Sequence, residues 1–338
     1  MDASELHRKA WVADAHADSL MWNRDLTQQS SRGHVDFVRL KEAGVKVQCF
    51  TIVTRGFPLI GAFPAFMRYC RWPKSARTSE WTRAIWQIEQ LEQFSARSQG
   101  EVRIAKRRSD LETNLRDGKI SAVLGVEGAH AVEGRVDRVA ELFAKGVRFM
   151  SLTHLSNNEL GGSSFPLMLP KRLTPLGGEI LDAMAKLKMA VDVAHASRKS
   201  LEDILSHPSA QPFCSHTGVD GVARMWRNLP DEALRKIADR GGVVGIIFGT
   251  VYLGGKRIED VVRHIEHAAN VAGEDAVGLG SDFDGMVPLP RGMRDVRDLS
   301  LLTDALLRRH PEPWVEKVIG GNLTRFLAQI LGDGIEAA

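Results

Sequence analysis

The sequence predicts a (β/α)8 barrel, and three observations lead to this fold class. Eight short apolar segments recur along the 338 residues, and most are apolar throughout, as is typical of parallel strands covered on both faces. Longer amphipathic segments alternate with them, which favours helices packed around a parallel sheet. The length suits one barrel domain over residues 1–338. A doubly wound sheet, the runner-up, calls for a glycine-rich turn after the first strand, and residues 14–18 do not provide one.

The predicted strands each end in turn or polar residues. In chain order they are Ala10–His16, Val45–Val53, Ile120–Glu127, Val147–His154, Met189–His195, Pro212–His216, Gly242–Phe248 and Ala276–Asp282. Between them, apolar residues spaced by three and four predict helices. The clearest are Trp81–Ser98, Leu176–Leu187 and Ile258–Val271, and Ser197 and Pro230 are typical of helix starts.

Two segments do not fit the alternation of strands and helices. Residues 55–80 are rich in Phe, Pro, Trp and Arg, and we interpret them as an insertion near the barrel mouth that would serve as a lid. Residues 157–174 are rich in Gly, Ser and Pro and predict a loop over the same face. The simpler alternative is that both are ordinary surface loops.

Composition excludes several classes of protein. Hydrophobic residues make up 43% and charged residues 26%, so the chain is neither disordered nor fibrous. The net charge of +3 comes from mixed signs and gives no reason to expect nucleic acid binding. No apolar run approaches the roughly 20 residues of a membrane helix. Three dispersed cysteines (Cys49, Cys70 and Cys214) and a charged N-terminus predict reduced thiols and a cytoplasmic location.

Ionisable side chains stand at the carboxyl ends of most predicted strands. Such groups are costly to bury unpaired, so their position calls for a function. In a barrel these ends converge on one mouth, where active sites are built. The sequence therefore predicts one pocket formed by His16, Asp18, Glu127, His154, His195, His216 and Asp282.

The chemistry of this set is that of a metal site. His16 and Asp18 lie two apart on an extended chain and point the same way. Imidazoles and carboxylates without thiolates suit Zn²⁺ or a related divalent ion. One carboxylate can bridge two ions about 3.5–4 Å apart, which polarise a carbonyl and generate hydroxide from bound water. Glu127, on a different strand, is the natural bridge, and Asp282 would be the base that passes a proton to the leaving amine.

Several alternatives stay open from the residues alone. A single strand-end histidine is more often structural than a ligand, and the agreement of six strand ends is what favours the metal site. His130 could be a ligand, although a hydrogen-bonding role that orients the ligands, or a structural role in the loop, fits better. Asp284 could replace Asp282 as the base. Asp182 and Asp192 receive no role. The remaining histidines are interpreted as surface residues: His7, His34, His207, His264, His267 and His310.

Seven short motifs, taken together, resemble one known family. They are DAHAD at 14–18, GVEGAH at 125–130, SLTH at 151–154, DVAH at 192–195, CSH at 214–216, RN at 227–228 and GLGSDFDG at 278–285. In this order, over nearly the whole chain, they resemble the renal (membrane) dipeptidase family. These are binuclear zinc peptidases of the amidohydrolase superfamily.

The resemblance implies a (β/α)8 barrel with two zinc ions and a role for each motif residue. His16 and Asp18 would bind one zinc, His195 and His216 the other, and Glu127 would bridge them. Many amidohydrolases use a carboxylated lysine instead, and residues 148–154 contain no lysine. The resemblance further implies that His154 stabilises the oxyanion, Arg227 holds the substrate's C-terminal carboxylate and Asp282 is the acid/base. Nearby Arg224 is the competitor for the carboxylate role.

The implied activity is zinc-dependent hydrolysis of dipeptides by a metal-bridged hydroxide, with tolerance of a D-residue at the C-terminal position. An N-acyl amino acid amidohydrolase or lactonase using the same site is the alternative. Loss of activity on Arg227→Ala would separate them, because a lactonase needs no carboxylate anchor. A non-catalytic barrel would have lost a ligand or the base, and none is missing. The family often forms homodimers, so a homodimer is expected. The 55–80 insertion does not match the family pattern and leaves substrate preference open.

Overall fold

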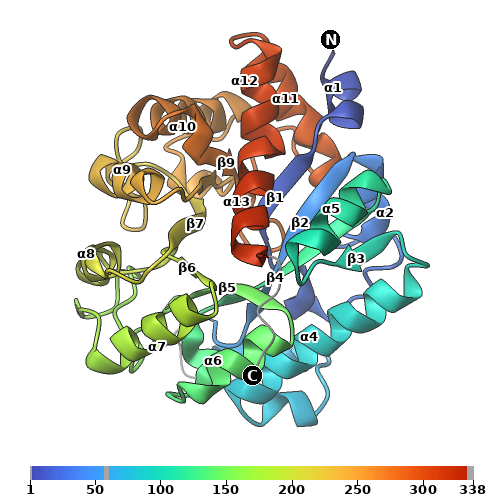
Figure 1. Ribbon diagram of the computed structural model, residues 1–338. Helices are drawn as coiled ribbons and strands as arrows, with labels where there is room; N and C mark the ends of the chain where they lie inside the picture. The colour runs from blue at the N-terminus through green and yellow to red at the C-terminus, as the bar shows by residue number, and fades with distance from the viewer. Residues whose placement is uncertain (1, 57–60, 333–338) are drawn as a thin grey trace.

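Eight parallel strands close into a barrel in the computed structural model, which describes residues 2–56 and 61–332 (Figure 1). The strand order is β2-β1-β9-β8-β7-β6-β5-β4, and pairing of β2 with β4 closes the ring. A short extra strand, β3 (Val102–Ile104), pairs with the start of β4. The barrel strands are β1 (Val12–Ala17), β2 (Val45–Val53), β4 (Ile120–Glu127), β5 (Val147–Ser151), β6 (Ala190–Asp192), β7 (Pro212–Thr217), β8 (Val244–Ile246) and β9 (Val277–Leu279).

All eight predicted strands are barrel strands, which confirms the predicted fold class. The predicted bounds of β2 and β4 agree with the structure, whereas β5, β6, β8 and β9 end earlier than predicted. The reason lies in the backbone beyond the ladder. His195 and Asp282 have φ angles of 65° and 60°, so the chain has already left the extended conformation where these polar residues occur.

Helices surround the strands, and the three predicted from periodicity are α4 (Glu80–Arg97), α7 (Pro175–Lys186) and α10 (Ile258–Ala272). Ser197 caps α8 by accepting a hydrogen bond from the Ser200 N–H, and Pro230 precedes α9, as predicted. The other helices are α1 (Ala3–Lys9), α2 (Phe37–Glu42), α5 (Arg108–Arg116), α6 (Asp137–Ala144), α8 (Arg198–Ser206), α9 (Asp231–Asp239), α11 (Leu299–Leu307), α12 (Glu312–Glu316) and α13 (Asn322–Leu331). None of the helices in the described ranges is both long and apolar enough to span a bilayer.

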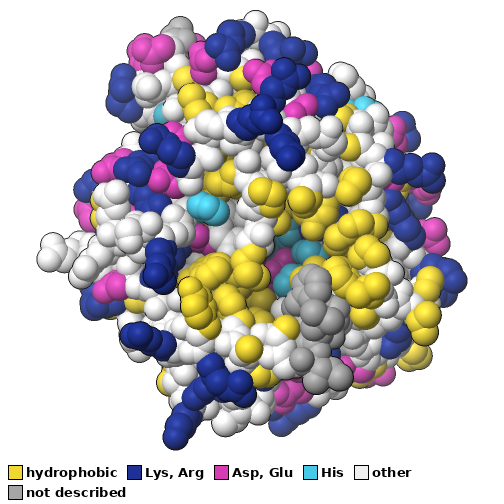
Figure 2. All heavy atoms as spheres, turned by 180° about the vertical axis from the view of Figure 1, so that it is seen from behind, with side chains coloured by type: hydrophobic (Ala, Val, Ile, Leu, Met, Phe, Trp, Pro, Cys, Tyr) yellow, Lys and Arg dark blue, Asp and Glu magenta, His cyan; other side chains and the backbone are white. Residues whose placement is uncertain are grey.

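The amino end of the barrel is closed by α13, which crosses it in Figure 1. Phe326 of α13 stacks on Phe213 with ring centroids 4.9 Å apart, and Phe213 packs edge to face against Phe149. This apolar plug leaves the carboxyl ends of the strands as the open face. Figure 2, seen from that side, shows a hollow with histidine and acidic side chains inside a largely hydrophobic rim.

The predicted insertion at residues 55–80 contains secondary structure and its own small core. Within it lie α3 (Ala62–Tyr69) and the 3₁₀ turn η2 (Ser75–Arg77), while residues 57–60 fall outside the described ranges. Trp72 is buried and donates its indole N–H to the carbonyl of Met21, 2.8 Å away. Met21 belongs to the 3₁₀ turn η1 (Ser19–Trp22) that follows β1, so the insertion is attached beside the mouth.

Two of the histidines predicted to be surface residues are buried, and that prediction was wrong for them. His7 lies between the carbonyl of Ala43 and the hydroxyl of Thr303. His264 accepts a hydrogen bond from the Val219 N–H at Nδ1 and donates from Nε2 to the Leu253 carbonyl. The physical reason is the same in both cases, because each imidazole bridges two elements with one donor and one acceptor. His34, His207, His267 and His310 are partly exposed.

Candidate metal centre

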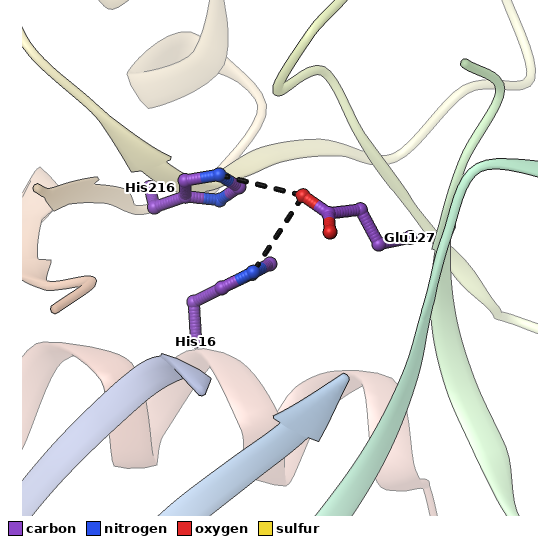
Figure 3. Close-up of side chains that lie close together, drawn as sticks. All are labelled: His16, Glu127 and His216. Carbon is purple, nitrogen blue, oxygen red and sulfur yellow. Dashed lines mark ion pairs between the residues drawn. The ribbon is translucent and has the colours of Figure 1, made fainter. Parts of the chain in front are cut away.

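Glu127 lies at the centre of the predicted cluster, at the carboxyl end of β4. Its Oε1 is 3.6 Å from His16 Nε2, 3.5 Å from His216 Nε2 and 2.9 Å from His195 Nε2. Figure 3 shows His16 and His216 converging on this oxygen from opposite strands. Gly128 makes the sharp turn after it with a φ of 90°, and a Cβ there would lie 2.7 Å from the His130 ring. One carboxylate therefore contacts ligands contributed by three different strands or strand ends.

The other polar groups divide into two sets on either side of Glu127. On one side, His16 Nε2 lies 3.4 Å from Asp18 Oδ1 and 4.0 Å from Asp282 Oδ1. On the other side, the Nε2 atoms of His195 and His216 are 3.1 Å apart. Three overlapping groups of possible ligands result, and Glu127 belongs to two of them: His16, Glu127 and His216; Glu127, His154 and His195; and His16, Asp18 and Asp282.

Backbone strain accompanies two of these residues. The left-handed φ angles of His195 and Asp282 are uncommon for residues with a Cβ and cost about 1–3 kcal/mol each. The surrounding structure supports the second turn, because the Asp18 N–H donates to the Phe283 carbonyl over 2.9 Å. The turns orient both side chains into the pocket, so the strain serves the site.

Burial and charge shift the pKa values of several groups in the cluster. Burial lowers the pKa of His195 to about 3, with Arg227 adding to the effect, and burial also lowers the pKa of His216. Burial opposes protonation of His16, but the carboxylates of Glu127 and Asp18 raise its pKa to about 10. Burial raises the pKa of Asp18, and Glu127 adds to this shift. Closely packed buried carboxylates repel one another, and bound cations would offset this repulsion.

The residues fit a pair of divalent metal ions. Within the described part of the chain, Glu127 Oε2 and His195 Nδ1 are buried and have no hydrogen-bond partner. The facing Nε2 atoms of His195 and His216 present lone pairs to the same space. The donor set contains only nitrogen and oxygen, which suits zinc and similar ions.

Comparison with known proteins identifies the family of the chain. The family model of the membrane dipeptidases, peptidase family M19, matches residues 1–332.

The chain belongs to the membrane dipeptidase family.

Individual relatives extend over most of this metallo-dipeptidase. A Klebsiella pneumoniae protein described only as lying in the pqqA 5′ region is 33% identical over 261 residues, covering 73% of this chain and 96% of that one. A metallopeptidase from Rhodobacter sphaeroides, solved with a phosphinate mimic of the dipeptide L-Ala-D-Ala, is 25% identical with a TM-score of 0.83, covering 95% and 99% of the two chains. A probable dipeptidase from Pseudomonas aeruginosa shares the fold at 20% identity, with a TM-score of 0.84 and 97% of each chain covered.

Arg227 lies against two candidate metal ligands of the dipeptidase, His195 and His216. Its Nη2 is 3.3 Å from His195 Nε2 and donates to the His216 carbonyl over 3.2 Å, and its guanidinium lies 4.9 Å from the ring centroid of Tyr252. Nε and Nη1 are buried without a partner among the described residues. The competitor Arg224 is exposed to solvent. Arg227 therefore offers unused donors in the pocket, and Arg224 does not.

His154 occupies the rim of the cluster in a defined orientation. Its Nδ1 is 2.8 Å from the carbonyl oxygen of Arg55, and its Nε2 is 3.5 Å from Glu127 Oε2. A carbonyl can only accept, so Nδ1 carries a hydrogen. Nε2 is then the atom that faces the pocket.

The two alternatives left open by the sequence lie in different surroundings. Asp284 is occupied: Oδ1 accepts from the His34 N–H, and Oδ2 accepts from the Ser19 hydroxyl and the Arg24 guanidinium. Among the described residues, Asp282 has no comparable set of partners, and it contacts the cluster directly. His130 is buried beside Asn158, and no group of candidate ligands in the described residues includes it.

Sequence reasoning missed the residues that hold the ligands. Asp192, which received no role, accepts hydrogen bonds from the Ser215 N–H and hydroxyl at 2.9 and 2.5 Å. Asp14 accepts from the N–H and hydroxyl of Ser281, both at 2.7 Å. Each is an acidic residue inside an apolar run, two or three positions before a histidine at the strand end. That pattern was the available signal.

Proposed function

We propose that this metallo-dipeptidase is a zinc enzyme that hydrolyses dipeptides with a free C-terminal carboxylate and accepts a D-residue at the second position. The observation that carries the proposal is Arg227, whose Nε and Nη1 are buried beside His195 with no hydrogen-bond partner in the described ranges. An arginine in that state suits bidentate binding of a carboxylate. The binding of an L-Ala-D-Ala mimic by the Rhodobacter sphaeroides relative supports the stereochemical part.

The metal ions would be held by His16 and Asp18 on one side and by His195 and His216 on the other, with Glu127 shared. Bound there, two zinc ions would polarise the scissile carbonyl and lower the pKa of the attacking water. The N/O donor set supports this assignment, as does Glu127 Oε2, which is buried without a hydrogen-bond partner among the described residues.

The remaining steps belong to side chains of this chain. Arg227 would fix the substrate's carboxylate and so place the peptide bond over the cluster. The Nδ1–H of His154 donates to the backbone carbonyl of Arg55, which directs Nε2 into the pocket. From there an Nε2–H would donate to the developing oxyanion. Asp282 would accept a proton from the attacking water and deliver it to the leaving amine. Burial raises the pKa of Asp282, and the Asp18 carboxylate adds to this effect.

The test is hydrolysis of paired L-Xaa-L-Xaa and L-Xaa-D-Xaa dipeptides by the purified protein, with and without added zinc. We expect metal-dependent release of free amino acids from both series and its loss in Asp282→Asn. Asp182→Asn, an exposed carboxylate on α7, is the matched control and should keep full activity. Protein that holds about two metal ions per chain but hydrolyses no dipeptide would contradict the proposal.

A further inference from the structure

A cavity of about 900 Å³ is lined in part by Asp284, two residues after Asp282 of the candidate metal centre. Its walls come from η1 and the turn after it, from the loop at residues 30–34, from the end of α3 and from the turn after β9. A volume of this size is ample for a small ligand or a long side chain. We name it the arginine cavity, after Arg24, Arg32 and Arg71 in its lining.

The arginine cavity carries excess positive charge. Among its described lining residues the one carboxylate is Asp284, and that group already accepts from Ser19, His34 and Arg24. No carboxylate in the described ranges comes within ion-pair distance of Arg32 or Arg71, and both are exposed. Arg24 Nε is buried and has no hydrogen-bond partner in the part of the chain that the structure describes. Such a lining is complementary to an anion.

The aromatic and backbone framework holds these cations in place. Trp22 donates its indole N–H to the Asp284 carbonyl over 2.7 Å and packs edge to face on Phe66 of α3. Asn23 donates its amide to the carbonyls of Cys70 and Arg71 at 2.9 and 3.1 Å. The insertion is thereby joined to the segment after β1, which positions Arg71 at the cavity.

The cavity and the metal centre share one wall. Asp284 follows Asp282 by two residues, and a Cβ built on the next residue, Gly285, would lie 1.9 Å from Asp282 Oδ1 and 3.1 Å from Asp18 Oδ2. Arg227 contacts the other set of ligands, His195 and His216. A dipeptide with its carboxylate on Arg227 and its peptide bond over Glu127 would therefore extend its first residue toward the Asp282 side.

We propose that the arginine cavity receives the side chain of the first substrate residue and selects a carboxylate there, so that preferred substrates are dipeptides with an acidic first residue. The inference rests on the proposed function and deepens it. Trp22 and Tyr69 would pack on the methylene groups of that side chain, while Arg32 and Arg71 would bind its carboxylate.

The test compares L-Glu-D-Ala with L-Gln-D-Ala, which have nearly the same shape and differ in charge. We expect kcat/KM to be at least tenfold higher for the Glu substrate at low salt, and the ratio to fall as ionic strength rises. Arg71→Gln should bring the ratio toward one. Arg68→Gln, an exposed cation near the end of α3 that lines a different cavity, is the matched control and should leave the ratio unchanged.

The outcomes separate the inference from the function on which it rests. Hydrolysis of both substrates with a ratio of one or less would overturn the inference and leave the dipeptidase proposal intact. Absence of hydrolysis of every dipeptide would overturn both. Glutarate is the third probe, because a free dicarboxylate could use the same arginines. Competitive inhibition against L-Glu-D-Ala supports a substrate subsite, whereas a changed rate on L-Gln-D-Ala without competition would indicate a separate anion site and overturn the inference.

Discussion

Asp192 accepts a hydrogen bond from the Ser215 hydroxyl over 2.5 Å, and this contact determines the state of two metal-facing histidines. Ser215 Oγ is also 3.1 Å from His16 Nδ1 and 2.8 Å from His216 Nδ1. A hydroxyl has one hydrogen, which Asp192 takes, so its lone pairs can accept from both Nδ1–H groups. Both Nε2 lone pairs are then directed toward Glu127 and the metal positions.

Asp192→Asn should weaken metal binding while leaving the fold in place. Asp192 Oδ1 accepts from two backbone N–H groups, of Ala194 and Ser215, so an asparagine would keep its oxygen there. Its amide nitrogen would then donate to Ser215 Oγ and compete with the histidine donors. We expect metal affinity to fall roughly 10–100-fold, measured by titration with a competing chelator. Asp182→Asn is the control, and equal affinities in the two variants would contradict the assignment.

Arg227→Lys should raise KM for dipeptides and leave the fold unchanged. Lysine supplies a point charge where the guanidinium supplies two parallel donors, and it cannot replace the contact with the His216 carbonyl in the same geometry. We expect KM to rise about tenfold to hundredfold, roughly 1.4–2.7 kcal/mol. Arg224→Lys, in the same loop but exposed, should have no effect. If dipeptide amides were hydrolysed as well as the free acids, the carboxylate role would be wrong.

The barrel strands were predictable because burial on both faces produces continuous apolar runs that differ clearly from their surroundings. The strand-end ligands stood out for the complementary reason that a polar group at the end of such a run is costly without a function. His264 was misjudged although its position was informative. It lies three residues after Val261 and four before Ala268, both buried, and so on the buried face of α10.

Other features depend on contacts between segments far apart in sequence. Strand β3 is three residues long and too short for a periodicity signal. The arginine cavity combines residues from 22–34, 69–71 and 284–286, and nothing in any one segment indicates a shared pocket. The support of two histidines by Ser215 likewise depends on β1 and β7 facing each other across the barrel. Local patterns cannot show such relationships before the fold is known.

Removal of the metal ions should destabilise the protein. Glu127, Asp18 and Asp282 are buried close together, and without cations their charges repel or their protons must be retained. A metal ion present at 100 times its dissociation constant adds about 2.7 kcal/mol per site if it binds only the folded state. We expect chelation to lower the melting temperature by several degrees and zinc to restore it. Thermal unfolding measures this, and Glu127→Gln, which weakens the shared ligand, should respond less to zinc.

Stability should fall as the pH drops below about 6.5, and His264 should be one cause. Burial lowers the pKa of His264 to about 4 from an ordinary value of 6.5, so the unfolded chain binds this proton first. The contribution of neutral, buried His264 to the free energy of unfolding is fully present above pH 6.5. It is lost as the pH falls toward 4, and the loss amounts to up to about 3 kcal/mol. Urea unfolding at several pH values tests it. His264→Gln should flatten the profile between pH 6.5 and 4, whereas His267→Gln, a partly exposed neighbour on the same helix, should not. An unchanged profile in His264→Gln would show that the acid sensitivity arises elsewhere.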